Sequence, residues 1–174
     1  MNALAADLLA PMTRYSPAEN GLLDFEREAS GSLRCIPMMV RFKLDRVRAK
    51  LALQQWRQLE RAERAWLVLQ PGESFEEVSA YRAWLIAAPL AQTDQPPKLF
   101  SPGPSPDWPR PDVVADSVTA WCVGLGLSSP GTACWARMSP LQHFTLTKLR
   151  RSGHEKDSYL VAMVEFGLLE APYG

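Results

Sequence analysis

The apolar residues of this chain recur mainly at the spacing of an α-helix. Between residues 30 and 50, the apolar positions fall near i, i+4, i+8 and i+11, so they share one helical face. That face consists of Ile36, Val40, Leu44 and Val47. Pro37 fits the first helical turn, where its missing amide is not needed. We therefore predict a helix here with a buried apolar stripe.

The same spacing predicts a long helix over residues 51–70, which Pro71 and Gly72 would end. Its apolar face consists of Leu59, Ala62, Trp66 and Leu69. Ser74 and Glu77 then have capping-box spacing, in which each side chain accepts a hydrogen bond from the other residue's amide. This box predicts the start of a third helix that ends near residue 89. Its buried face would consist of Val78, Tyr81 and Leu85.

The second half of the chain shows two further helical signals. An apolar stripe predicts a helix that ends at Gly124 and Gly126. The stripe consists of Val114, Val118, Trp121, Cys122 and Leu125. Ser139 and Gln142 form a second capping box, with proline at the first helical position. We predict that the helix following this box stops at Gly153.

The segment 158–169 is ambiguous. Its apolar positions suit a helix, yet its valines and aromatic residues also suit a buried strand. We favour the helix, because no nearby segment offers a pairing partner. The expected fold class is all-α: a compact single-domain bundle of about six helices with a proline-rich loop in its middle.

That loop spans residues 94–111, where proline is so frequent that neither a helix nor a central strand can form. Two interpretations fit: an exposed linker, or an ordered loop held over the core by Leu99, Phe100 and Trp108. Because a chain of 174 residues has the size of one domain, we favour the second. We therefore expect a single helical domain over residues 21–174, preceded by a flexible segment over residues 1–20.

Composition limits the classes of function. The chain carries 19 basic and 19 acidic residues and has no net charge, which argues against non-specific binding to nucleic acid or to a membrane surface. No apolar run approaches the roughly 20 residues of a membrane-spanning helix. Three cysteines without close spacing are typical of a reducing compartment. We expect a cytoplasmic protein that binds neither nucleic acid nor membrane.

Two segments match known catalytic or cofactor-binding motifs only in part. The glycines at 124 and 126 resemble a dinucleotide-binding loop, but they end a helical stripe instead of following a strand. His154 and Glu155 begin a zinc-binding HExxH pattern, but position 158 is a serine. We therefore expect no catalytic residue, no resident metal and no cofactor. An alternative ligand site would use Cys35 with His154 and Glu155.

The segment 30–50 is also markedly basic, with one acid, Asp45, among six cations. These cations lie largely off the apolar stripe, so they either pair with acids elsewhere in the fold or form a partner surface. Both alternatives stay open. In the second, cations would meet an acidic partner and flexible apolar side chains would add contact area. The predicted partner-binding residues are Arg34, Met38, Arg41, Phe42, Lys43 and Arg46.

A family resemblance covers roughly two-thirds of the chain. It is carried by FEREASGSLRCIPMMVRFKLD at 25–45, the LALQQW that follows at 51–56, YRAWL at 81–85 and the tail at 135–169, which contains LQHFTLTKLRRSGHEKDSYLVAMVEFGLL. These blocks resemble the bacterial nitrate reductase-associated protein family. The resemblance implies a link to nitrate assimilation and a role in producing active nitrate reductase. It assigns no catalytic residue, and His143 stands where the family's tail would have arginine.

Two functions are therefore expected. The first is a non-catalytic accessory or maturation factor that binds a protein client, with nitrate reductase as the candidate, through the basic and apolar helix face. The second is a small-ligand or metal-binding protein, or an unrecognised enzyme, that uses Cys35, His154 and Glu155.

Overall fold

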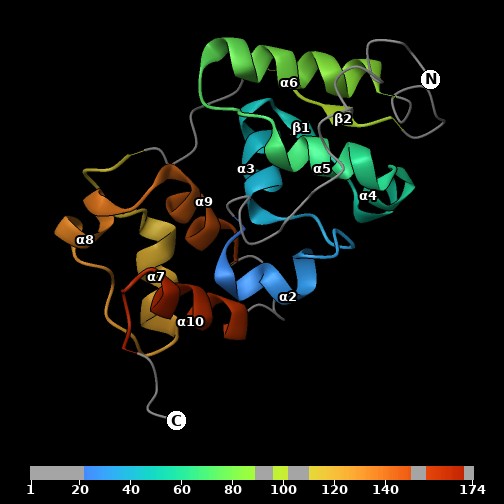
Figure 1. The fold of residues 1–174 in the computed structure, drawn as a ribbon. Coiled ribbons are helices and arrows are strands. Elements are labelled where there is room, and N and C mark those ends of the chain that lie inside the picture. Colours follow the sequence, from blue (N-terminus) through green and yellow to red (C-terminus); the bar gives the residue numbers. More distant parts are fainter. Residues whose placement is uncertain (1–21, 89–95, 102–109, 150–155, 171–174) are drawn as a thin grey trace. The chain divides into compact units, whose positions relative to one another are not determined.

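A computed structural model describes residues 22–88, 96–101, 110–149 and 156–170, which are mostly helical (Figure 1). The all-α class is confirmed, although the helices are shorter and more numerous than the six expected. The sheet in the described residues is one antiparallel pair, β1 (Ala49–Lys50) with β2 (Lys98–Leu99). The chain divides into two compact units, Met1–Pro102 and Gly103–Gly174. The expectation of a single domain over residues 21–174 stays a prediction.

Both units contain several short helices. The first unit contains η3 (Asp24–Glu26), α2 (Arg27–Ser30), α3 (Met38–Arg46), α4 (Leu53–Gln58), α5 (Arg61–Leu69) and α6 (Phe75–Ala87). The second contains α7 (Asp116–Gly124), α8 (Thr132–Arg137), α9 (Pro140–Leu149) and α10 (Lys156–Glu165). The ambiguous segment 158–169 is thus helical as far as Glu165, which confirms the favoured interpretation.

The predicted stripe of α3 is buried in the core of the first unit. All four of its apolar residues belong to one cluster together with side chains of α4, α5 and α6. Pro37 precedes the helix and has no side-chain oxygen to cap it. Instead, the buried Glu26 accepts a hydrogen bond from the Met38 amide at 2.8 Å. An acid from η3 therefore stabilises the positive end of α3.

The predicted helix over residues 51–70 is wrong in one respect, because it is two helices. Leu59 and Glu60 are extended, with ψ of 144° and 157°. Glu63 accepts a hydrogen bond from the Glu60 amide at 2.7 Å and so starts α5. This break turns Leu59 into the core, while Leu69, predicted on the same face, is partly exposed.

Both predicted capping boxes are confirmed. The Glu77 amide donates to Ser74 Oγ at 3.2 Å, and the Ser74 amide donates to Glu77 Oε2 at 2.9 Å. At α9, the Gln142 amide donates to Ser139 Oγ at 3.2 Å, and the Ser139 amide donates to Gln142 Oε1 at 2.8 Å. These local contacts fix where α6 and α9 begin.

The predicted flexible segment 1–20 and most of the predicted proline-rich loop lie outside the described residues, and so does Trp108. Leu99 and Phe100 were predicted to hold that loop over the core, but both are partly exposed. This end of the loop is held by the backbone instead. The Phe100 amide donates to the Arg48 carbonyl at 2.8 Å, next to the β1–β2 pair.

Candidate partner-binding surface

Of the six predicted partner-binding residues, three are buried, two are exposed, and Arg46 is half-buried. Met38, Phe42 and Lys43 are buried in the first unit, and each is less than a tenth exposed. Arg34 and Arg41 are exposed. Three of the six side chains are therefore packed inside the fold and are not available at its surface.

Lys43 is committed to the carbonyl end of α5. Its Nζ donates to the Val68 carbonyl at 2.6 Å and lies 3.4 Å from the Leu67 carbonyl. The last carbonyls of a helix lack intrahelical partners, so a cation there satisfies them and meets the negative end of the helix dipole. Burial lowers the pKa of Lys43 from its ordinary 10.5 to about 8.

Two further contacts complete the environment of Lys43. The ring centre of Tyr81 lies 5.9 Å from Nζ, and the Tyr81 hydroxyl donates to the Leu67 carbonyl at 3.1 Å. Burial raises the pKa of Tyr81 well above its ordinary value. Lys43 thus connects α3, α5 and α6 inside the fold.

Arg46 is also used within the fold. Its Nη2 donates to the Glu73 carbonyl at 2.6 Å, and its guanidinium lies 5.6 Å from the Phe42 ring centre. Of the two alternatives for the basic segment, Lys43 and Arg46 therefore follow the intramolecular one. Their hydrogen-bond acceptors are backbone carbonyls rather than the carboxylates that the sequence suggested.

Two exposed arginines of the basic segment, Arg34 and Arg41, gather with the half-buried Arg64 around the loop from Leu33 to Ile36. Arg41 Nε donates to the Ile36 carbonyl at 3.1 Å. Arg64, from α5, donates from Nη1 to the Leu33 carbonyl at 2.8 Å and from Nε to the Leu59 carbonyl at 3.1 Å. Arg34 lies within the loop itself and is exposed.

We call Arg34, Arg41 and Arg64 the arginine surface. Within the described ranges, none of the three forms an ion pair with a carboxylate. Two of the guanidinium groups are positioned by backbone carbonyls and keep further N–H donors for a ligand. Guanidinium groups bind carboxylates and phosphates through paired hydrogen bonds, so this surface suits an acidic partner.

The loop itself is conformationally strained. Leu33 has a φ of 56°, in the left-handed region that a residue with a branched side chain rarely adopts. The Leu33 side chain is fully buried, and its carbonyl also accepts a hydrogen bond from Trp56 Nε1 at 2.8 Å. Trp56 and Arg64 therefore both hold the Leu33 carbonyl. These hydrogen bonds fix the backbone next to Arg34 and Cys35.

Sequence reasoning missed Arg64. Its position in the middle of a supposed long helix gave no sign that its guanidinium reaches the carbonyls of two loops. The approach of α5 to the Leu33 turn exists only in the folded chain.

The comparison with known families is decisive for the identity of the chain. Residues 22–166 match the family described as conserved nitrate reductase-associated protein. The chain belongs to this family. No curated protein and no solved structure shows a significant match.

The matched range of this nitrate reductase-associated family member includes the arginine surface and extends through both compact units. The resemblance inferred from the sequence blocks is thereby confirmed. None of the helices in the described parts of the chain is long and apolar enough to cross a membrane.

The alternative ligand site is only partly described. Cys35 is half-buried in the loop from Leu33 to Ile36, whereas His154 and Glu155 lie outside the described residues. In the described ranges, no three His, Cys, Asp or Glu residues are grouped so that they could hold a metal ion. The alternative site stays a prediction.

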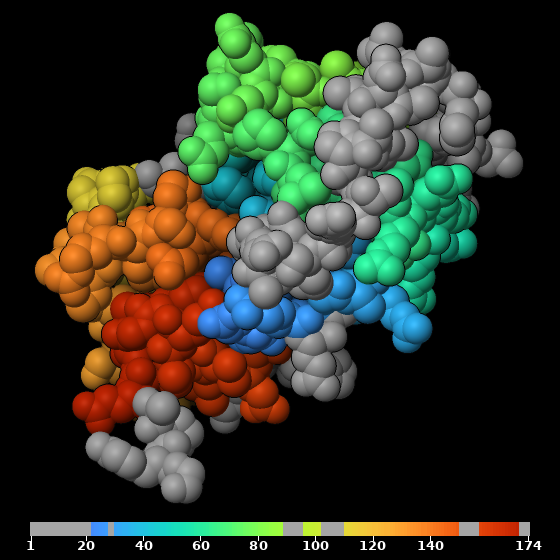
Figure 2. Space-filling model, in the orientation of Figure 1, coloured from blue at the N-terminus to red at the C-terminus, as the bar shows by residue number. Residues whose placement is uncertain are grey.

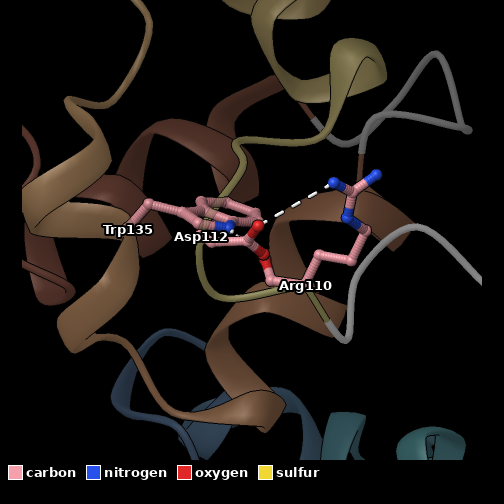
Figure 3. A network of polar contacts seen from close by, with 3 residues as sticks. All are labelled: Arg110, Asp112 and Trp135. Carbon is pink, nitrogen blue, oxygen red and sulfur yellow. Dashed lines mark hydrogen bonds and ion pairs between the residues drawn. The ribbon is translucent and has the colours of Figure 1, made fainter.

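The second unit contains a buried aromatic pair rather than an exposed contact residue. Trp135 lies in α8 and is fully buried. Its Nε1 donates to the Arg110 carbonyl at 2.9 Å, next to an exposed Arg110–Asp112 pair 3.8 Å apart (Figure 3). The His143 ring stacks on the Trp135 ring, with 4.1 Å between the ring centres. Trp135 is therefore a core residue.

Proposed function

We propose that this protein is a non-catalytic accessory or maturation factor that binds a nitrate reductase, or a related client, through the arginine surface. The observation that carries the proposal is the family match over residues 22–166. The client-binding role and the residues that serve it are the new part of the proposal.

The chemistry of the arginine surface supports an acidic segment of the client as its ligand. Because Arg41 and Arg64 are already held by loop carbonyls, they lose little conformational freedom when a carboxylate binds. Complementary charge would also steer the encounter and make it sensitive to salt. Met38 and Phe42, which the sequence pattern predicts at the contact, are buried within the first unit.

Charge reversal tests this proposal directly. In the double variant Arg34→Glu/Arg41→Glu, we expect binding to purified nitrate reductase of the native host to weaken at least about tenfold, because attraction becomes repulsion. Titration calorimetry at two salt concentrations would measure the dissociation constants. We expect salt to weaken binding of the wild type and to weaken binding of the variant less.

The matched control is Lys50→Glu/Lys98→Glu, which makes the same change of charge at two exposed lysines that pair across β1 and β2. We expect this control to bind like the wild type. A folded Arg34→Glu/Arg41→Glu protein that binds with unchanged affinity would remove the arginine surface from the mechanism. A wild-type protein that neither binds nitrate reductase nor alters its activity would refute the function itself.

A further inference from the structure

The three residues of the arginine surface differ in how their N–H donors are used. Arg41 is exposed, and its Nε donates to the Ile36 carbonyl at 3.1 Å. Among the described residues, its two terminal nitrogens, Nη1 and Nη2, have no hydrogen-bond acceptor. Arg41 therefore keeps one complete pair of donors open, while a third donor holds the guanidinium group in place.

Arg64 and Arg34 do not combine these two properties. Arg64 is half-buried, and it donates from Nε to the Leu59 carbonyl and from Nη1 to the Leu33 carbonyl. Arg34 is exposed, but within the described part of the chain no acceptor holds its guanidinium group. Arg64 thus mainly anchors the loop, and Arg34 contributes a charge whose direction is not fixed.

The turn at Leu33 gives this surface a rigid backbone. The Leu33 amide donates to the Ser30 carbonyl at 2.8 Å, and the Leu33 carbonyl accepts from Trp56 and from Arg64. A left-handed φ at a buried leucine persists only where the surroundings determine it this fully. In Figure 2, the light blue residues that follow α2 lie at the surface, next to the turquoise residues of α4.

The acceptor that holds Arg41 is itself fixed in direction. Ile36 is buried, and it precedes Pro37, which restricts the backbone of the residue before it to extended conformations. The Ile36 carbonyl therefore has little freedom to turn, and neither has the Arg41 group that donates to it.

We propose that Arg41 is the specificity-determining residue of the arginine surface. It binds one carboxylate of the client's acidic segment through Nη1 and Nη2 together, while Arg34 adds charge and Arg64 holds the loop. This role rests on the proposed function and deepens it by naming the contact and the chemical group recognised. A planar guanidinium edge matches the two oxygens of a carboxylate, whereas a lysine offers only a point charge.

The number of open donors favours a carboxylate over a phosphate group. The free edge of Arg41 supplies two parallel donors, which suit the two oxygens of a carboxylate, whereas a phosphate group presents a third oxygen. Phosphate sites commonly use backbone amides for the remaining oxygens. Here the Leu33 amide is already taken by the Ser30 carbonyl.

Charge-preserving substitutions test the role of Arg41. In Arg41→Lys, we expect binding to purified nitrate reductase of the native host to weaken about tenfold or more, because the charge stays and the paired donors are lost. Arg34→Lys should weaken binding at most about threefold, since lysine keeps the charge. The control is Arg137→Lys, at an exposed arginine of α8 in the second unit, and it should bind like the wild type. Titration calorimetry would measure the dissociation constants, and circular dichroism would confirm folding.

A second measurement needs no client. In the wild type, titration with a hexaglutamate peptide should shift the NMR signal of the Arg41 Nε–H group to saturation. Inorganic phosphate at the same ionic strength should shift this signal much less. In Arg41→Lys, the affinity for the peptide, followed through the Arg64 Nε–H signal, should fall about tenfold.

Several results would overturn this role. Unchanged affinity of Arg41→Lys, or an equal loss in Arg34→Lys, would show that charge alone is recognised, and the proposed function would then stand without it. A larger NMR response to phosphate than to the peptide would exclude the carboxylate as the preferred ligand. A wild type that does not bind nitrate reductase would refute the proposed function, and the peptide titration alone would then decide the role of Arg41.

Discussion

Lys43 is a cation held against the carbonyl oxygens that end α5. At this position the lysine loses most of its hydration, and that loss lowers its pKa to about 8 despite the nearby acids Glu73 and Glu77. The contact arises from the length of the lysine side chain, which reaches from α3 to the end of α5. A residue that lies off the apolar stripe of a helix can therefore still be buried.

The pH dependence of stability should reveal this burial. Between pH of about 8 and 10.5, the folded chain has released the Lys43 proton while the unfolded chain still holds it. The unfolded state then binds more protons, so the free energy of unfolding rises with pH in this window. We expect the stability of the wild type relative to Lys43→Met to increase across the window, as measured by urea denaturation. A difference that stays flat would show that the amine is solvated.

The Glu26 carboxylate caps the start of α3. Its carboxylate replaces the missing cap of α3, because Pro37 offers no side-chain oxygen. We expect Glu26→Ala to lower the free energy of unfolding by about 1–3 kcal/mol, since the Met38 amide is then buried without that acceptor. Urea denaturation would measure the loss.

The exposed Glu76, in the first turn of α6, provides the comparison. Glu76→Ala should change the free energy of unfolding by no more than about 0.5 kcal/mol. Equal effects of the two substitutions would show that the hydrogen bond from Met38 does not stabilise α3.

At the same scale, local signals predicted where helices start more reliably than where they break. Ser74 with Glu77, and Ser139 with Gln142, act over three residues, so the sequence contains everything they need. The interruption at Leu59 and Glu60 depends on Arg64 and on the core that accepts Leu59. The helical spacing of the apolar residues continues through this break. The spacing alone therefore predicts one helix over residues 51–70.

At the scale of the whole molecule, the family match spans both compact units. We therefore expect the units to unfold together, as the single-domain prediction requires. Leu67→Ala, at a fully buried position of the first unit, should cost about 2–5 kcal/mol. Hydrogen exchange should then show the same loss of protection for amides of α9 in the second unit.

Leu146→Ala, in the core of the second unit, is the reciprocal variant and should lower the protection of α5 amides equally. If either substitution affects only its own unit, the prediction of one domain over residues 21–174 is wrong. The units would then be two domains joined within the proline-rich segment.

The sequence by itself determined the helical class, the buried stripe of α3, the capped starts of α6 and α9, and the family. These follow from periodicity, short-range hydrogen bonding and contiguous blocks of residues. Tertiary structure decided which cations are exposed. Lys43 and Arg46 reach the carbonyls of α5 and of the turn before α6, whereas Arg41 and Arg64 converge on the Leu33 loop. Such choices depend on acceptors distant in sequence, whose positions exist only once the helices have packed.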